Sequence, residues 1–229
     1  MSKKREPKTA ELTLEWGKYP HYKHIVGLDE AGRGAWAGAL VVGAVALPLA
    51  LGEETLRLEL AGVRDSKEMT RLSRERLVKK ITDMADAWGV GVVEHHEVDE
   101  LKLTGAIILG IKRALVDLQA RYPHFTPDYL FTDGLMKGDL GVPYDTIVKG
   151  DQKSLSIAAA SVIAKTYRDE MMRALDDDYP QYHFGQHKGY GTTLHRQAIQ
   201  RYGILPIHRH FYSPIQKVGA SSDNPPLIP

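Results

Sequence analysis

Apolar residues in this chain follow two kinds of spacing, and each kind predicts a type of element. Short runs rich in valine, isoleucine and leucine, bounded by turn residues, are typical of buried strands. Five strands are predicted, at residues 25–29, 40–47, 88–94, 129–132 and 146–148. Pro48 ends the second of them, because proline cannot donate a hydrogen bond to a neighbouring strand.

Helical spacing separates these runs. Four helices are predicted, at residues 72–86, 104–120, 156–175 and 193–202. The second is the clearest, because its apolar residues follow the 3.6 period: Ile107, Ile108, Ile111, Ala114, Leu115 and Leu118. Thr70 is a candidate cap for the first helix, and Gly203 closes the last. The third begins with small side chains that allow close packing on a sheet. Together the elements predict an α/β layered domain with helices on both faces.

The two ends of the chain lack such a pattern. Residues 1–20 are predicted to be a flexible leader, residues 21–213 a single domain, and residues 214–229 a Pro/Ser-rich tail. No apolar run reaches the roughly 18 residues that span a bilayer, and the basic N-terminus lacks the apolar stretch of a signal peptide. With no cysteine there is neither a disulfide nor a thiolate metal site. We therefore expect a cytoplasmic protein without a membrane partner, and by default a monomer.

Charge is nearly balanced over the whole chain but not locally. The net charge is +1, whereas residues 64–80 carry seven basic and three acidic side chains. Such a stretch is able to contact a phosphate backbone. The alternative is an ordinary solvated helix face.

Two adjacent carboxylates, Asp29 and Glu30, end the first predicted strand. Gly32, Arg33 and Gly34 follow at once. Carboxylates bind hard divalent cations, and glycines leave backbone N–H groups open to phosphate. A charged surface turn is the alternative. Because neighbouring strand residues face opposite sides, both acids reach one metal only if the strand ends or bulges there.

Two further acids follow predicted strands. Asp133 lies before a glycine turn, and Asp151 lies just ahead of the small-residue helix. Singly, each is typical of a turn. Together with Asp29 and Glu30 they are positioned to meet at one sheet edge, where four carboxylates repel one another unless cations neutralise them. Phosphodiester chemistry with two metals is a natural use of such a site.

Other polar motifs are weaker signals. Tyr190 lies between glycines and is able to offer its ring to a sugar or base. The hydroxyl and ammonium of Ser66 and Lys67 suit phosphate, although the segment also fits a turn that leads into a helix. His95 and His96 are expected to diverge on a strand, which disfavours a metal pair. A phosphate contact and a surface loop are the two interpretations of the segment 208–210.

Together and in this order, these segments resemble bacterial ribonuclease HII, the type 2 ribonuclease H. The resemblance runs from about Ile25 to Phe211. It rests on six motifs: residues 27–34, 65–67, 132–134, 149–165, 187–192 and 206–209. Each motif alone is weak, whereas six in the family order are highly specific.

The resemblance implies a ribonuclease H-like α/β fold, with a mixed five-stranded sheet flanked by helices and additional C-terminal helices. It implies a metal-dependent endonuclease for replication and repair. Such an enzyme hydrolyses the RNA strand of RNA–DNA hybrids and cuts 5′ of single ribonucleotides embedded in duplex DNA, leaving a 3′-hydroxyl and a 5′-phosphate. Mn²⁺ or Mg²⁺ is the expected cofactor, with two ions per site when substrate is bound. The C-terminal tail is a candidate docking peptide for a replication factor.

The same resemblance assigns roles to residues. The catalytic, metal-binding acids are Asp29, Glu30, Asp133 and Asp151. The substrate-binding set is Gly32, Arg33, Gly34, Ser66, Lys67, Lys153 and Tyr190. Within it, the Gly-Arg-Gly turn senses the ribose 2′-hydroxyl, which distinguishes RNA from DNA, and Tyr190 stacks on the next deoxyribose. Lys165 is either a phosphate contact or a helix-surface charge.

The chain departs from the family pattern in two places. Ala35 and Trp36 replace the usual proline and small apolar residue, and Ala39 replaces a second proline. Trp36 is expected to change the stiffness of the turn or its contact with the minor groove, which affects the preference between single ribonucleotides and long hybrids. Asp139 and Asp145 lie close to Asp151 in the sequence, and they are alternatives to it as the fourth acid.

Three rival functions are weighed against this one. Ribonuclease HIII shares the fold, but a leader of about 20 residues is too short for its usual N-terminal domain. A hybrid-binding protein without activity has no reason to keep four acids beside phosphates. A phosphatase for small molecules does not need the Gly-Arg-Gly turn and Tyr190, which favour a polymeric substrate that contains ribose.

Overall fold

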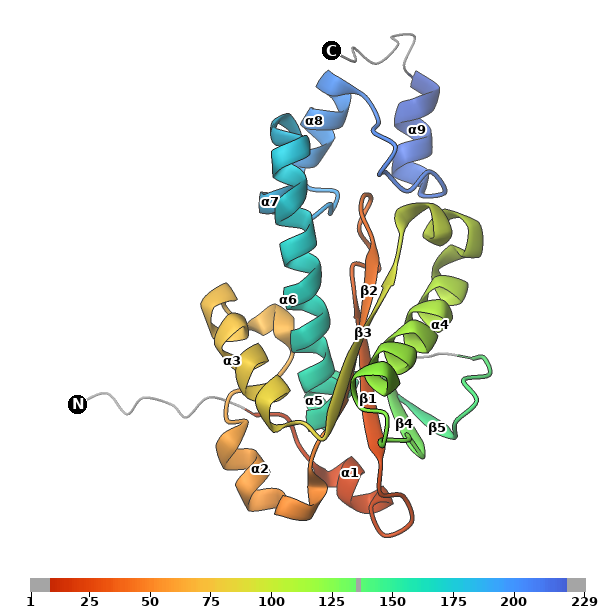
Figure 1. The fold of residues 1–229 in the computed structure, drawn as a ribbon. Helices are drawn as coiled ribbons and strands as arrows, with labels where there is room; N and C mark the ends of the chain where they lie inside the picture. Colours follow the sequence, from red (N-terminus) through yellow and green to blue (C-terminus); the bar gives the residue numbers. More distant parts are fainter. Residues whose placement is uncertain (1–8, 135–136, 222–229) are drawn as a thin grey trace, which may run out of the picture.

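The computed structural model describes residues 9–134 and 137–221 (Figure 1). Within them a five-stranded sheet has the order β3-β2-β1-β4-β5. Its strands are β1 (Ile25–Ala31), β2 (Leu40–Ala46), β3 (Ala87–Val93), β4 (Tyr129–Asp133) and β5 (Tyr144–Ile147). β1 pairs antiparallel with β2, and β2 with β3, whereas β4 lies parallel to β1 and β5. The sheet is therefore mixed, which confirms the expected fold class.

The described helices include the four that were predicted. They are α1 (Thr13–Lys18), α2 (Glu53–Glu59), α3 (Arg71–Met84), α4 (His95–Arg121), α5 (Gly150–Lys153), α6 (Leu155–Asp178), α7 (Phe184–His187), α8 (Thr193–Tyr202) and α9 (Ser213–Ser221). Short 3₁₀ helices η1 (Leu49–Leu51), η2 (Ser66–Glu68) and η3 (Pro180–Tyr182) lie between them. Thr70 caps α3, since its hydroxyl accepts a hydrogen bond from the Ser73 N–H. None of the described helices is long and apolar enough to cross a membrane.

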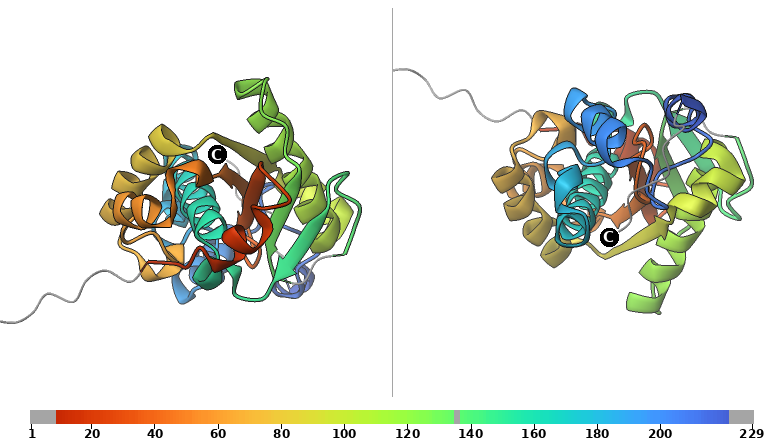
Figure 2. Two further views of the ribbon diagram at one scale, coloured as in Figure 1. Left: turned by 90° about the horizontal axis from the view of Figure 1, so that it is seen from below. Right: turned by 90° about the horizontal axis from the view of Figure 1, so that it is seen from above.

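Helices cover both faces of the sheet, as expected. α6 packs on β1 and β2 from one side, and α4 packs on β2 and β3 from the other (Figure 2). The approach of α6 is close because glycines face it. A Cβ at Gly27 would lie 2.2 Å from the Ser156 carbonyl carbon, and one at Gly43 would lie 2.4 Å from the Ala160 carbonyl oxygen. The small residues that begin α6 thus let its backbone rest directly on the sheet.

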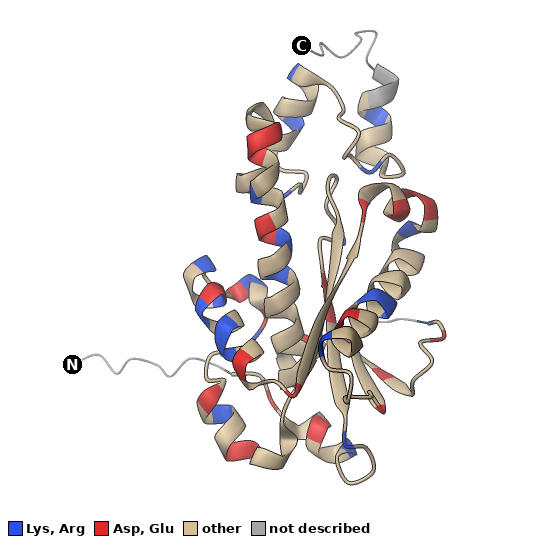
Figure 3. Ribbon diagram, in the orientation of Figure 1, with Lys and Arg blue, Asp and Glu red and all other residues tan. Residues whose placement is uncertain are grey.

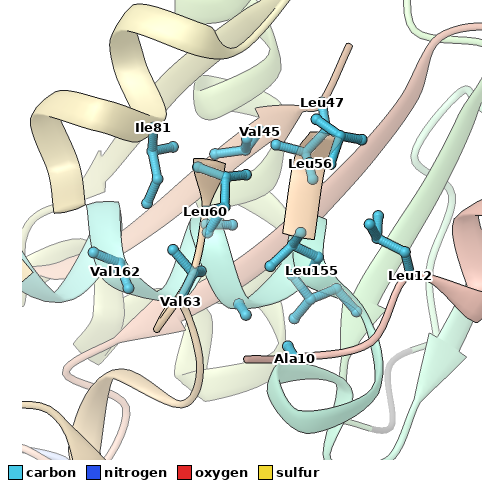
Figure 4. Close-up of a cluster of buried hydrophobic side chains, with 14 of the residues drawn as sticks. Ala10, Leu12, Val45, Leu47, Leu56, Leu60, Val63, Ile81, Leu155 and Val162 are labelled. Atoms are coloured by element: carbon cyan, nitrogen blue, oxygen red, sulfur yellow. The ribbon is translucent and has the colours of Figure 1, made fainter. Parts of the chain in front are cut away.

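A hydrophobic core fixes α6 between the sheet and two outer helices. Val45 of β2, Leu56 of α2, Leu60 directly after α2, Ile81 of α3 and Val162 of α6 are all buried in it (Figure 4). Fully burying one such side chain contributes roughly 1.5–3 kcal/mol. This core therefore fixes the N-terminal half of α6, which follows α5 and the site residue Asp151 in the chain.

The prediction of a flexible leader over residues 1–20 is wrong for residues 9–20. Leu12 is buried, and α1 carries Glu15, whose carboxylate accepts hydrogen bonds from the hydroxyls of Ser154 and Ser156 and from the Ser156 N–H. Glu15 thus caps the beginning of α6, and this long-range contact orders a segment without helical periodicity. Residues 1–8 lie outside the described residues.

Two other expectations are corrected. α4 begins at His95 instead of residue 104, with a break in helical geometry at Lys102, so that His95 and His96 lie on a helix and not on a strand. Residues 213–221 form α9, and Ile215 is buried against the C-terminal helices, so the predicted tail begins later than residue 214. Residues 222–229 lie outside the described residues.

Candidate active site

The four predicted acids lie at one edge of the sheet, called the carboxylate edge. β1 and β4 are parallel neighbours, and their register pairs Leu28 with Thr132, which places Asp29 and Asp133 next in line on adjacent strands. The Asp133 carboxylate accepts a hydrogen bond of 2.6 Å from the Gly150 N–H at the beginning of α5. Since α5 also carries Asp151, this bond brings the fourth acid to the same edge.

Asp29 and Glu30 face opposite sides of the sheet, because β1 continues to Ala31. Asp29 faces α6, where Ser161 donates a hydrogen bond to its carboxylate. One small cavity next to Ile107 of α4 is nevertheless lined by Asp29, Glu30 and Asp133 together, so the three acids border one space. Among the described residues, no three His, Cys, Asp or Glu side chains are close enough to hold a metal ion as they stand. Mg²⁺ is usually held by only one or two carboxylates, with water and substrate phosphate as its other ligands.

Burial and mutual repulsion make the carboxylate edge electrostatically strained. Burial, followed by the charges of Glu30 and Asp133, raises the pKa of Asp29 well above its usual value. Burial also raises the pKa of Glu30, although Arg33 partly offsets this from 3.7 Å away. Burial and the charges of Asp65 and Asp133 raise the pKa of Asp151 to about 6. A cluster of oxygen ligands in this state fits a hard divalent cation, which would relieve the repulsion.

Lys67 is the basic side chain that the structure brings to these acids. Its Nζ lies 4.0 Å from Asp151 Oδ2 and 3.9 Å from Asp65 Oδ1, yet 71% of the side chain is exposed. Burial opposes its charge, but the surrounding carboxylates, with Asp65 first, leave the pKa of Lys67 raised. Its ammonium is therefore charged, accessible and beside the carboxylate edge, as a phosphate contact requires.

The side chain of Ser66 is not positioned to contact a substrate. It is buried, and its hydroxyl lies 2.8 Å from that of Ser161, the residue that donates to Asp29. Arg74 holds η2 in place by donating to the Ser66 carbonyl and to Asp169. Lys165 binds the other oxygen of Asp169 at 2.6 Å. Ser66 and Lys165 thus support the site from within.

The Gly-Arg-Gly turn lies directly after the acids. Gly32 has φ +92°, and a Cβ there would lie 2.0 Å from Nε of the buried Arg168. A Cβ at Gly34 would meet no atom within 4 Å, and 58% of the Arg33 side chain is exposed. The inner side of the turn is therefore filled by the protein, whereas its outer side is open to a ligand.

Tyr190 lies near this turn. Its half-buried ring has the Arg168 guanidinium 5.5 Å and the Lys165 ammonium 5.8 Å from its centroid. The backbone of Trp36 joins the two segments, because its N–H donates to the Gly189 carbonyl at 2.8 Å. The Trp36 ring is buried against Gly191 and the C-terminal helices. Of the two expected effects of Trp36, contact with the minor groove is therefore wrong. The structure favours the other effect, a change in the stiffness of the turn.

Several candidates fall outside the site. Asp139 accepts from the Gly141 N–H, and Asp145 pairs with Lys18 at 2.9 Å, so both alternatives to Asp151 are engaged elsewhere. Lys153 is exposed at the end of α5, and within the described residues it makes no ion pair with the four acids. Basic side chains recur along α3 and α6 (Figure 3). Most of those of α3 are exposed, as in the pair of Arg71 with Glu75, whereas Arg74 binds the buried Asp169.

Sequence reasoning missed the buried side chains behind the site. Arg168, His195, His208 and Arg209 are all fully buried. His208 and Arg209 had two interpretations, a phosphate contact and a surface loop, and both are wrong. The sequence signal for two of them is weak. The Pro-Ile-His-Arg segment follows an amphipathic helix and has no apolar pattern of its own, although it packs against the domain.

Comparison with known proteins agrees with this geometry. Residues 26–214 match the family model described as Ribonuclease HII. A protein of that name from Acetivibrio thermocellus is 45% identical over 82% of this chain and 69% of its own length. Another from Dehalococcoides mccartyi is 42% identical over 91% of this chain and 97% of its own.

Solved structures share the fold. The ribonuclease H2 from Pyrococcus horikoshii is similar with a TM-score of 0.65 and 25% identity, over 86% of this chain and 97% of that one. The structure of Bst-RNase HIII in complex with Mn²⁺ has a TM-score of 0.68 at 20% identity, over 87% of this chain and 70% of that one. The second likeness shows the fold alone.

Proposed function

The chain belongs to the ribonuclease HII family of endoribonucleases acting on RNA–DNA hybrids, and from this premise we propose its cleavage specificity and its catalytic residues. It hydrolyses the RNA strand of hybrids and cuts 5′ of a single ribonucleotide in duplex DNA. The products carry a 3′-hydroxyl and a 5′-phosphate. The observation that carries this proposal is the carboxylate edge, which lies directly beside an open Gly-Arg-Gly turn.

Asp29, Glu30, Asp133 and Asp151 are the proposed metal-binding acids. Their raised pKa values mark Asp29, Glu30 and Asp151 as oxygen ligands that gain from a cation. When bound, Mn²⁺ or Mg²⁺, two per site with substrate, supplies an activated water and offsets negative charge at phosphorus and at the leaving 3′-oxygen. The chain fixes where this happens, because strand register positions Asp29 and Asp133, and the Gly150 bond positions Asp151.

Recognition falls to the residues around the edge. Lys67 binds a phosphate of the scissile strand, since its exposed ammonium lies 4.0 Å from Asp151. The outer side of the turn from Gly32 to Gly34 contacts the 2′-hydroxyl. A side chain on that side would exclude the sugar. Tyr190 places its ring against the following deoxyribose. Lys153 is a more distant phosphate contact, and Ser66 acts by positioning Ser161 and Asp29.

The catalytic unit is proposed to extend over residues 21–213, with α1 docked on it through Glu15. Docking of a replication factor on the C-terminal tail remains a prediction for residues outside the described range. We also propose that the protein acts in the cytoplasm and is a monomer.

A labelled DNA duplex with one ribonucleotide tests the proposal. Wild-type protein and the Asp133→Asn variant are incubated with it in Mn²⁺, Mg²⁺ or chelator, and the product ends are mapped. We expect metal-dependent cutting 5′ of the ribonucleotide that the variant loses. Cutting of long hybrids alone would show that the turn does not sense a single 2′-hydroxyl. Binding without any cutting would leave only a hybrid-binding protein.

A further inference from the structure

Residues 205–212, hereafter the strap, join the two elements proposed to recognise the ribonucleotide. The Gly38 N–H donates to the Ile207 carbonyl at 2.9 Å, and the Arg209 N–H donates to the Trp36 carbonyl at 2.7 Å. The strap therefore lies along the segment that follows the Gly-Arg-Gly turn. We propose that three buried side chains, His195, His208 and Arg209, together the clamp, fix this turn relative to Tyr190 and so determine the preference for a single ribonucleotide over a continuous hybrid. The inference rests on the proposed function.

Arg209 holds the turn. Its side chain is fully buried, and its Nη1 donates to the carbonyls of Gly32 at 2.7 Å and Arg33 at 3.2 Å. Its Nε donates to the Gly38 carbonyl at 3.0 Å. One guanidinium thus binds three carbonyls on both sides of residues 34–37. Because guanidinium is planar, these bonds fix the orientation of the turn as well as its position.

The two histidines hold the Tyr190 segment, and the hydrogen bonds determine their tautomers. The Tyr190 carbonyl can only accept, so His195 Nδ1, 3.1 Å away, carries the proton and donates it. His195 Nε2 must then accept from His208 Nε2, 3.1 Å away. His208 Nδ1 has the Leu205 N–H at 2.9 Å and the Leu205 carbonyl oxygen at 3.1 Å, and with its proton on Nε2 it accepts from the N–H. The bonds run in one direction from the strap to Tyr190.

Burial keeps this chain of imidazoles neutral. It lowers the pKa of His195 to about 3 and that of His208 to about 4. The His187 ring stacks on His195 with centroids 4.3 Å apart, and its Nδ1 accepts from the Gly189 N–H. Neutral rings with fixed tautomers make the bond to the Tyr190 carbonyl permanent at physiological pH.

His208 and Arg209 are adjacent in the strap, so one short segment sets the distance between turn and tyrosine. That distance matters most for a single ribonucleotide. Such a substrate offers one 2′-hydroxyl followed by one deoxyribose, and both must be engaged at the same step. A continuous hybrid offers a 2′-hydroxyl at every step of the RNA strand, so it tolerates a displaced turn. Loosening the clamp should therefore lower cleavage of the single ribonucleotide more than cleavage of the hybrid.

The alternative is that the histidines only stabilise the C-terminal helices, since His195 and His208 also pack on Phe184. His195→Asn and His195→Gln separate the two roles. The Asn amide takes the place of Nδ1 and keeps a donor for the Tyr190 carbonyl. The Gln amide reaches the place of Nε2, and it keeps a partner for His208 but loses Tyr190.

The test measures kcat/KM of both variants and wild type on a duplex with one ribonucleotide and on a continuous hybrid, with thermal midpoints alongside. We expect His195→Gln to lower the ratio of the two values about 10-fold, which corresponds to one lost hydrogen bond. His195→Asn should keep the ratio within about 2-fold, whatever its thermal midpoint. Equal loss on both substrates in both variants would show a structural role only and overturn the inference. Wild-type protein that cuts neither duplex would instead overturn the proposed function.

Tyr212→Phe gives a milder second test, because Tyr212 is only partly buried and is expected to fold normally without its hydroxyl. Its hydroxyl donates to the Arg33 carbonyl from the end of the strap. The variant should lower the substrate ratio about 3-fold at an unchanged thermal midpoint. An unchanged ratio would contradict control of the turn by the strap.

Discussion

The carboxylate edge and the clamp lie on either side of the same turn and are built in opposite ways. In the edge, strands position Asp29, Glu30 and Asp133 and α5 positions Asp151, but the charges of these acids repel one another. The clamp consists of three buried side chains, and two of them, Arg209 and His195, bind carbonyls of irregular backbone. The edge has a simple geometry, but its carboxylates repel one another. The clamp has a more complex geometry, and most of its polar atoms have hydrogen-bond partners.

This difference shows what each region contributes. Buried like charges weaken the folded state and are kept where a ligand uses them. Buried side chains bonded to main-chain carbonyls specify one loop conformation. Even in the clamp one group is left over, because Nη2 of Arg209 is buried and has no partner among the described residues. We therefore assign chemistry to the edge and selectivity to the clamp.

The largest expected effect follows from neutralising the edge. Asp151→Asn should lower cleavage by more than about 100-fold, because one of the proposed metal-binding carboxylates is lost. It should also stabilise the protein at pH 7 by about 1–3 kcal/mol, since the pKa of Asp151 is raised to about 6 in the folded state. Urea unfolding and cleavage rates measure the two effects.

The size of that gain depends on pH. The unfolded carboxyl ionises near its ordinary pKa, so the folded state is penalised above pH 6, and the penalty disappears as the pH falls towards 4. The advantage of Asp151→Asn over wild type should shrink accordingly. A variant that is less stable than wild type at pH 7 would mean that Asp151 makes a favourable structural contact instead.

Gly32→Ala tests the inner side of the turn. A Cβ 2.0 Å from Arg168 Nε at φ +92° should destabilise the protein by about 3 kcal/mol. Gly34→Ala is the matched control, because nothing lies within 4 Å of its Cβ position, and its unfolding free energy should change by less than about 0.5 kcal/mol. Equal effects of the two substitutions on denaturant unfolding would show that Arg168 does not support the turn.

Acid should weaken the clamp and not the edge. Because the pKa of His195 is lowered to about 3, the unfolded state binds the proton first, and stability is lost as the pH falls below the ordinary histidine value. Between pH 7 and 5, wild type should lose about 1–2 kcal/mol more unfolding free energy than His195→Phe. Parallel stability curves for the two proteins would contradict a neutral, buried His195.

The smallest effect is expected at Lys67. Lys67→Gln should raise KM by about 5-fold and change the unfolding free energy by less than about 0.5 kcal/mol, because its ammonium is exposed. Lys153→Gln is the control, because Lys153 is exposed at the end of α5 and makes no ion pair with the four acids within the described residues, and it should raise KM less. The order of the two KM values decides which lysine is nearer the scissile phosphate.

The edge was predictable from the sequence because its signals are local. Apolar runs mark β1 and β4, and an acid at the end of each falls on the same sheet edge in a parallel pair. The side chain of Ser66 was placed wrongly, because its partner Ser161 lies 95 residues away. A local motif shows that a hydroxyl follows Asp65 but not which way it points.

The clamp was not predictable because its contacts are long-range. Arg209 binds the carbonyl of Gly32, 177 residues earlier, and a single arginine after a helix resembles any surface charge. α1 was missed for the same reason, since Glu15 finds its partners 139 and 141 residues later. Trp36 departs from the family pattern, and only the fold shows that its ring is buried beneath Gly191.

The division of labour between edge and clamp is tested most directly by single-turnover cleavage of two duplexes, one with a single ribonucleotide and one a continuous hybrid. Wild type, Asp133→Asn and His195→Gln are compared with metal in excess. We predict that Asp133→Asn slows both cleavages by the same large factor, while His195→Gln slows the single-ribonucleotide duplex selectively. A change of substrate ratio in Asp133→Asn, together with an unchanged ratio in His195→Gln, would contradict this division.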